Sequence, residues 1–107
     1  MKRYIISADA RADLDEIWDY IAGGSSAEVA SRFLWNLYDT FASLRQSPSA
    51  GVLMPDLGAG TRKFPMGQYL IYYRPMRGKV LIWRVLHGKR AQRRALRRPV
   101  VFSGTPA

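Results

Sequence analysis

The sequence has no cysteine, a single histidine and no acidic residue after Asp56. Without cysteine, the 107-residue chain has neither disulfides nor thiolate metal sites, which is typical of a protein from a reducing compartment. The first residues lack the apolar run of a signal peptide, and no apolar run approaches the roughly 20 residues of a membrane helix. We therefore expect a cytoplasmic protein without membrane contact.

Recognisable catalytic motifs are also missing. The sequence contains no Gly-rich phosphate loop, no nucleophile elbow and no HExxH motif, and no serine stands beside the histidine to suggest a hydrolase triad. The acids of the first helix are predicted to form a solvated face rather than a catalytic carboxylate pair; they are Asp13, Asp15, Glu16 and Asp19. We predict no cofactor and no metal.

Charge is distributed unevenly along the chain. Residues 1–56 contain all eight acidic residues and five basic ones, whereas residues 57–107 contain twelve basic residues and no acid, for a net charge of +9. A uniformly cationic half attracts a polyanion or an acidic protein segment. The alternative is that the charge only maintains solubility. We favour a binding partner, because solubility does not require the acids to be missing from half of the chain.

The N-terminal half is predicted to form a strand and two helices. Residues 2–7 favour a short strand, and Ser7 is suited to cap a first helix that ends at Gly23-Gly24. Ser25 and Glu28 match a capping box that opens a second helix, which ends before Pro48. Two amphipathic helices joined by a few residues form a helical hairpin whose apolar side covers one face of a sheet.

The C-terminal half is predicted to supply that sheet. Residues 48–60 are expected to form a loop and residues 61–65 a short strand, while residues 68–90 form a β-hairpin around a break at residues 74–78. Most strand aromatics are assigned to the core rather than to base stacking. The predicted fold is α+β, with an N-terminal strand, a helical hairpin and then an antiparallel sheet. It forms a single domain of residues 1–98, followed by a tail of residues 99–107.

Several cations are predicted to gather at one end of this sheet, where guanidinium groups would pair with phosphate or carboxylate. The candidate binding residues are Arg62, Lys63, Arg84, Lys89, Arg90, Arg93 and Arg94. Arg84 interrupts an apolar strand, so it is either buried against an acid or directed into a functional groove. Alternation places it on the face of Val80 and Ile82, unless a β-bulge reorders the strand. His87 stands at the predicted end of a strand, where a histidine usually makes an orienting hydrogen bond. We therefore expect a structural role for it rather than proton transfer on a nucleic-acid backbone.

Ordered segments of the chain resemble the ParE branch of the RelE/ParE toxin superfamily, the plasmid-stabilisation type. The resemblance covers about residues 3–90. The segments are ADLDEIWDYI at 12–21, ASRF at 30–33, PSAG at 48–51, MPDL at 54–57, TRKFP at 61–65, YLIYYR at 69–74 and RVLHGKR at 84–90.

The resemblance implies the toxin of a type II toxin–antitoxin module with the fold predicted above. It implies a ParD-like antitoxin whose acidic C-terminal segment wraps the toxin, DNA gyrase as the target, and operator DNA bound only through the antitoxin. The exposed side of the helical hairpin and the sheet edge are the expected docking surfaces. We expect a non-enzymatic inhibitor that causes growth arrest.

The alternative is a ribosome-dependent mRNA endonuclease of the RelE type. The candidate catalytic residues would then be Arg62, Arg84 and His87. The sibling RelE branch often uses a C-terminal tyrosine, and the region after Gly88 contains arginines but no tyrosine. The absence of a tyrosine there favours a toxin that inhibits its target by binding over one that cuts RNA.

Overall fold

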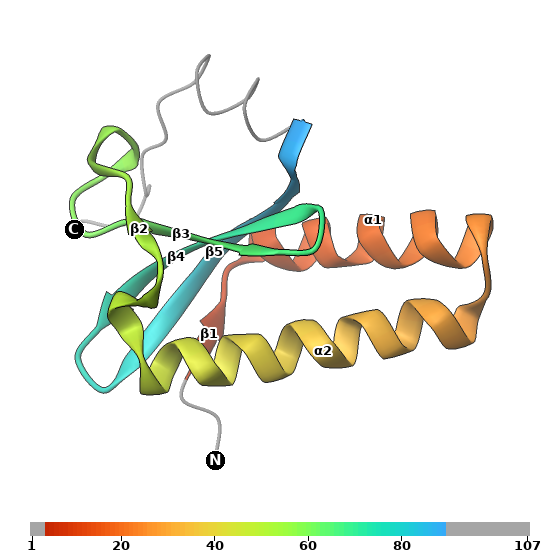
Figure 1. Ribbon diagram of the computed structural model, residues 1–107, viewed down its shortest axis with the longest axis horizontal. Coiled ribbons are helices and arrows are strands. Elements are labelled where there is room, and N and C mark those ends of the chain that lie inside the picture. The colour runs from red at the N-terminus through yellow and green to blue at the C-terminus, as the bar shows by residue number, and fades with distance from the viewer. Residues whose placement is uncertain (1–3, 90–107) are drawn as a thin grey trace.

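The computed structural model describes residues 4–89, which form five strands, two α-helices and two short 3₁₀ helices (Figure 1). In chain order they are β1 (Tyr4–Ile6), α1 (Ala8–Gly24), α2 (Ala27–Gln46), η1 (Pro48–Ala50), β2 (Val52–Leu53), η2 (Pro55–Leu57), β3 (Arg62–Met66), β4 (Tyr69–Met76) and β5 (Lys79–His87). The domain boundary at residue 98, the tail of residues 99–107 and the candidates Arg90, Arg93 and Arg94 lie outside the described residues.

The five strands form one mixed sheet in the order β1-β5-β4-β3-β2. Strands β2 to β5 pair in antiparallel fashion, whereas β1 lies at one edge and runs parallel to β5, with Tyr4 opposite Val80. The predicted α+β class is confirmed. The predicted antiparallel arrangement holds for all strands except β1, whose partner lies more than seventy residues later in the chain.

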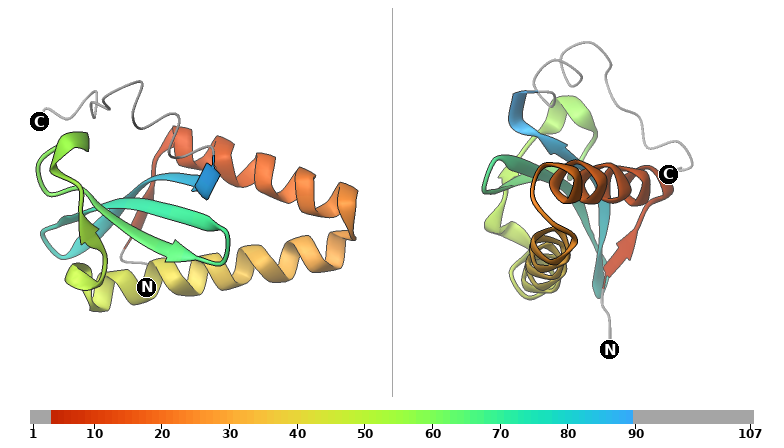
Figure 2. Two further views of the ribbon diagram at one scale, coloured as in Figure 1. Left: turned by 45° about the horizontal axis from the view of Figure 1, so that its top comes forward. Right: turned by 90° about the vertical axis from the view of Figure 1, so that its right-hand side faces the viewer.

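The two helices pack against one face of the sheet and extend beyond its end (Figures 1 and 2). The main core lies between the helical layer and the sheet. Its buried members include Leu14 and Ile17 from α1, and Leu37 and Phe41 from α2. These residues recur at helical spacing, which is why the amphipathic pattern predicted the layer. Within residues 4–89, neither helix has the length and apolar character needed to cross a membrane.

A smaller cluster occupies the opposite face of the sheet. Its buried members are Leu57, Tyr72, Trp83 and Leu86. The predicted core role of the strand aromatics is confirmed for Tyr72, Tyr73 and Trp83, all of which are buried.

Two helix boundaries test the capping predictions. Ser7 caps α1 as predicted, since its Oγ accepts a hydrogen bond from the backbone N–H of Ala10 at 2.9 Å. The prediction for α2 was wrong by one residue: Ser26 accepts from Val29 at 3.1 Å, and Ser25 instead follows the end of α1. Adjacent serines offer the same side chain, so the capping pattern alone does not separate them.

The hairpin turn is tighter than the predicted break at residues 74–78. Met76 pairs with Lys79, so only Arg77 and Gly78 form the turn, and Gly78 has a φ of 73°. That angle suits glycine at the third position of a type II turn. Pro75 lies within β4 because this part of the strand extends past the start of β3, where no neighbour requires its missing N–H.

Candidate functional site

Arg84 is held by a carboxylate of the first helix. Its Nε and Nη2 donate to the two carboxylate oxygens of Asp13 at 2.8 and 2.9 Å, and the backbone N–H of Val85 donates to the same carboxylate at 2.9 Å. The hydrogen bond to Asp13 raises the pKa of Arg84 above its usual value. Of the two alternatives for Arg84, burial against an acid is therefore the one observed.

Asp13 corrects the prediction that the acids of the first helix form a solvated face, because it is buried. Strand β1 ends at Ile6, so within the described part of the chain the edge of β5 beyond this point has no strand partner. Polar groups near the start of α1 complete the edge: the backbone N–H of Ser7 donates to the Ile82 carbonyl at 2.9 Å, and Ser7 Oγ donates to the Trp83 carbonyl at 2.7 Å. Asp13 then accepts from Val85, and its burial follows from this edge-capping role.

A β-bulge lies next to Arg84. Tyr72 pairs with Arg84 and Tyr73 with Ile82, which leaves Trp83 as the extra residue on β5. Val80, Ile82 and Val85 consequently belong to the core beneath the helices, while Trp83 and Leu86 belong to the cluster on the other face. The simple alternation is therefore broken at this position, which changes which side chains share a face.

His87 has a hydrogen-bond partner at each ring nitrogen. Its Nε2 lies 3.2 Å from Gln68 Oε1, and the backbone N–H of Lys89 donates to Nδ1 at 3.3 Å. A backbone N–H can only donate, so this geometry fits a ring that carries its proton on Nε2. The ring also meets Tyr69 edge to face at 5.4 Å, which is the orienting role that its place at the strand end favoured.

Arg62 fastens the segment that precedes the sheet. Its Nη1 donates to the carbonyls of Gly51 at 2.6 Å and Ser49 at 3.4 Å. The hydroxyl of Tyr73 accepts from the backbone N–H of Gly51 at 2.8 Å and donates to the Pro48 carbonyl at 2.7 Å. Together these contacts fix η1 and position the edge strand β2, a strand that the predicted loop at residues 48–60 did not include.

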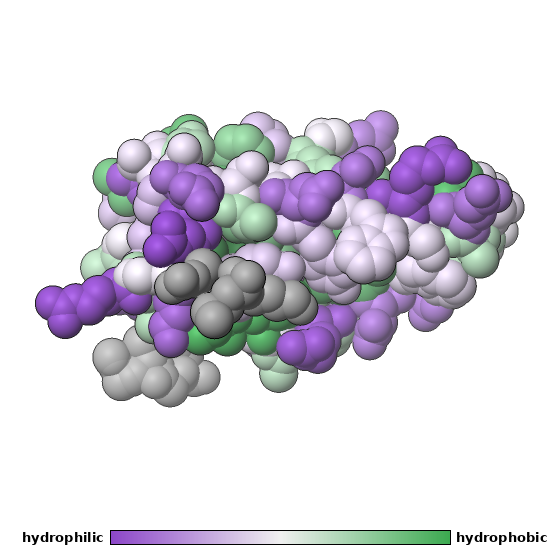
Figure 3. All heavy atoms as spheres, turned by 90° about the horizontal axis from the view of Figure 1, so that it is seen from below, coloured by the Kyte–Doolittle hydropathy of each residue, from purple (hydrophilic) through white to green (hydrophobic). Residues whose placement is uncertain are grey.

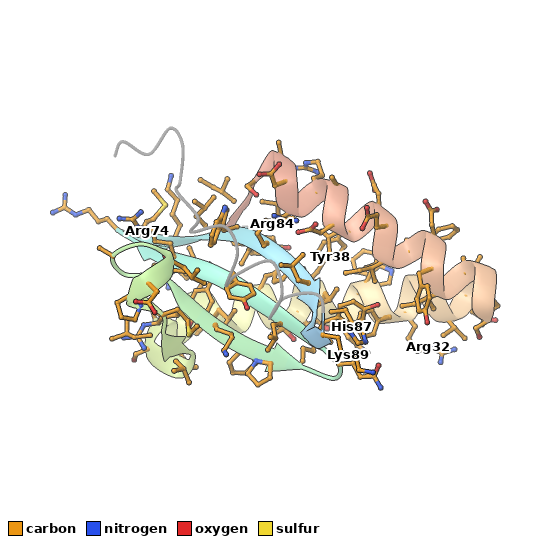
Figure 4. All side chains as sticks on the ribbon, turned by 90° about the horizontal axis from the view of Figure 1, so that it is seen from above. Arg32, Tyr38, Arg74, Arg84, His87 and Lys89 are labelled. Atoms are coloured by element: carbon orange, nitrogen blue, oxygen red, sulfur yellow. The ribbon has the colours of Figure 1, made fainter. Side chains whose placement is uncertain are left out.

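The predicted cations within residues 4–89 do not form one cluster, and Figure 4 shows Arg84 and Lys89 apart from each other. Arg62 begins β3 and Lys89 follows the end of β5; since these strands run in the same direction, the two residues lie at opposite ends of the sheet. Lys63 and Arg84 occupy one row across the sheet, with Tyr72 between them. The proposed single corner is therefore not present among the described residues.

A different set of cations gathers at the end of the sheet that holds the β4–β5 turn. Arg77 and Lys79 flank Gly78, and Arg45 at the end of α2 donates from Nε to the Gly78 carbonyl at 3.2 Å. Arg74 precedes the turn on β4. The prediction missed this set, although the turn sequence itself carries Arg74, Arg77 and Lys79 within six residues.

An open pocket of about 530 Å³ lies where α1 meets the end of β5. Its apolar lining comes from Ile17, Val85 and Leu86, and its polar and aromatic lining from Asp13, Glu16, Tyr20, Tyr69 and His87. The described lining contains no serine, threonine or lysine, and its titratable groups are two carboxylates, two phenols and one imidazole. The lining combines apolar surface with a few polar groups, as binding pockets do.

Large apolar side chains are also exposed elsewhere on the helices and on the edge strand. Tyr20, which lines the pocket, is 75% exposed, and Trp35 on α2 is 66% exposed. The edge strand β2 also exposes both of its residues, Val52 and Leu53. Large apolar groups on a surface mark candidate interaction sites.

Comparison with known proteins agrees with the resemblance drawn from the sequence. Residues 4–92 match the family described as "ParE toxin of type II toxin-antitoxin system, parDE". Toxin ParE1 of Caulobacter vibrioides is 36% identical over 87 residues, which cover 81% of this chain and 90% of that protein. Toxin ParE1 of Mycobacterium tuberculosis is 30% identical over 86 residues, covering 79% and 88%.

A solved structure described as "Chromosomal ParDE TA system from P. aeruginosa" has the same fold, with a TM-score of 0.67 at 21% identity. The match covers 81% of this chain and 96% of that chain. The length of the family match and the identity to the curated relatives lead to one conclusion. The chain belongs to the ParE toxin family of type II toxin–antitoxin systems.

Proposed function

We propose that this toxin inhibits DNA gyrase by binding to it in the cytoplasm, without catalysing a reaction of its own. The supporting observation is the state of the residues that the nuclease alternative requires. Arg62 is bonded to backbone carbonyls, Arg84 to Asp13, and His87 to Gln68 and Lys89. Arg62 and His87 also lie at opposite ends of the sheet, so they do not converge on one phosphate.

The test is a supercoiling assay with purified gyrase and purified full-length toxin. Inhibition, or accumulation of cleaved gyrase–DNA complex, is expected and should be reversed by the cognate antitoxin. No effect at toxin concentrations well above that of gyrase would rule out the proposal. Primer extension on mRNA after induction examines the RelE-type alternative, which requires codon-linked cuts.

Neutralisation is assigned to a ParD-like antitoxin, which also carries the complex to operator DNA. The pocket beside α1 is the candidate anchor site, because an antitoxin side chain that enters it would cover Tyr20 and reach the apolar floor formed by Ile17 and Leu86. Buried aromatic and apolar anchors dominate the affinity of such interfaces. Acidic residues of the same segment would accelerate association with the cationic half of the chain.

Replacement of single exposed aromatics tests this assignment. Tyr20→Ala should raise the dissociation constant for the antitoxin by about tenfold or more, as expected for an interface anchor. Trp35→Ala is the matched control, since it removes a similarly exposed aromatic from α2. Isothermal titration with the cognate antitoxin measures both. Equal loss for both variants, or loss for Trp35→Ala alone, would contradict the pocket as anchor.

A further inference from the structure

The β4–β5 turn and the end of α2 form a cationic end of the molecule, defined here by Arg45, Arg77 and Lys79. The hydrogen bond from Arg45 Nε to the Gly78 carbonyl joins the helix to the turn, so charges distant in sequence are held together. Arg77 and Lys79 are exposed, and a methyl group added at Gly78 would meet nothing within 4 Å. Figure 3 shows hydrophilic side chains projecting at the left end, where this turn lies in Figure 1.

Among the described residues, no carboxylate forms an ion pair with the cationic end. Within residues 4–89, no salt bridge involves Arg45, Arg77 or Lys79, whereas Arg84 has its partner in Asp13. Asp39 precedes Arg45 on α2, but six residues place the two on different sides of a helix. The field of these cations therefore extends into solvent, where it attracts an anionic partner.

The shape of this end favours a phosphate backbone over an acidic protein. A protein interface needs apolar anchors that enter pockets, and the described pocket lies at the other end of the sheet, beside His87. Among the described residues near the turn, the large exposed apolar side chains are those of Met76 and, on β1 opposite Leu81, Ile5, and neither lines the described pocket. A narrow projecting hairpin with cations on both sides can approach a duplex without requiring any particular base sequence.

We propose that the cationic end binds the phosphate backbone of duplex DNA, with Arg77 and Lys79 as the principal contacts and Arg45 beside them. The contact is independent of sequence, since guanidinium and ammonium groups that meet phosphates position a protein without reading bases. It rests on the proposed inhibition of gyrase for its setting, because an inhibitor that touches the DNA held by gyrase would be retained on the enzyme–DNA complex. This role is separate from operator recognition through the antitoxin.

The salt dependence of duplex binding tests the proposal directly. Full-length toxin is titrated against a fluorescein-labelled duplex of mixed sequence over a range of KCl concentrations. The slope of log K against log salt is negative, and each lost phosphate contact makes it less steep by about 0.9, so Arg77→Ala/Lys79→Ala should reduce its magnitude by about two. Affinity at low salt should fall about tenfold or more. Arg77→Lys, which keeps the charge, should retain both the slope and most of the affinity.

The matched control is Lys63→Ala/Lys89→Ala, which removes the same charge from the middle and opposite end of the sheet. An unchanged slope for this control supports a local contact. Equal slopes in the two double variants, or no change in Arg77→Ala/Lys79→Ala, would overturn the proposal. So would a double variant that keeps duplex binding and instead loses binding to polyglutamate, because the partner would then be an acidic protein.

The supercoiling assay on the same proteins keeps the two proposals distinguishable. A toxin that binds duplex through the turn but does not inhibit gyrase refutes the proposed function and leaves the DNA contact standing. A toxin that inhibits gyrase equally well in all variants, with unchanged duplex slopes, refutes the DNA contact alone. The substitutions are all on exposed or half-buried positions, so the fold should stay intact, and thermal unfolding of each variant checks this.

Discussion

Removal of Asp13 should destabilise the fold far more than removal of any other acid on α1. Asp13→Ala leaves the Arg84 guanidinium and the Val85 N–H without the partner that holds them at 2.8 to 2.9 Å. Breaking a buried ion pair by removing one partner costs roughly 3–5 kcal/mol. The Asp13 side chain is 8% exposed and that of Arg84 22%, so we take the lower end, about 3 kcal/mol. For a domain near this size, that loss lowers Tm by roughly 12 °C or more.

Arg84→Ala should be milder, at about 2 kcal/mol, because Asp13 keeps the Val85 N–H and gains access to water in the pocket. The double variant should be no less stable than Asp13→Ala alone, since both remove the same interaction. Asp15→Ala, on an exposed position of α1, is the matched control and should change stability by less than about 0.5 kcal/mol. Thermal and urea unfolding give these values. Equal losses for Asp13→Ala and Asp15→Ala would refute the edge-capping role.

The same variants separate structure from catalysis at Arg84. Under conditions where each variant is folded by circular dichroism, a structural role requires Asp13→Ala and Arg84→Ala to lose growth arrest together or to keep it together. A nuclease role requires Arg84→Ala to abolish mRNA cutting while Asp13→Ala still cuts.

Three further substitutions test the segment fastened to β4 and its buried tyrosines. Gly51→Ala should cost about 2 kcal/mol or more, since its Cβ would lie 2.7 Å from Tyr73 Oη and 2.8 Å from the Lys63 carbonyl, whereas Gly23→Ala meets nothing within 4 Å and should be neutral or stabilising in urea titrations. Tyr73→Phe should cost about 1–3 kcal/mol, because the Gly51 N–H loses its acceptor; an unchanged denaturation midpoint would exclude this role. Burial raises the pKa of Tyr72 above 10.0, so its contribution to stability is complete below that pH and is lost as pH rises through the folded-state value. The midpoint should therefore fall above about pH 10, and less steeply in Tyr72→Phe.

Local patterns predicted the layers of this fold well. Buried residues on both helices recur at helical spacing, and the strands of the β4–β5 hairpin are rich in aromatic and β-branched residues. These signals are contained within a few turns or a few strand residues. The position of β1 beside β5 depends instead on a partner far along the chain, and no local pattern specifies it.

The candidate site was harder to predict for the same physical reason. Asp13 and Arg84 are separated by 71 residues, and each looks solvent-directed or ambiguous when considered alone. The bulge at Trp83 then shifts which residues of β5 share a face. Arg62 finds its acceptors in backbone carbonyls near η1, and residue types do not reveal such carbonyls.

The basic residues discussed for the second half of the chain form two groups, half-buried ones on strands and exposed ones at the turn, and burial explains their different roles. Arg62 and Arg84 stand on strands and are half-buried, and a charge in such a place must find a partner; the chain supplies carbonyls to Arg62 and a carboxylate to Arg84. Arg77 and Lys79 stand at a turn, where water solvates them at no such cost. Their charge is therefore available to another molecule. In this fold the half-buried cations Arg62 and Arg84 maintain the structure, whereas Arg77 and Lys79 at the turn are the residues that we expect to contact a target.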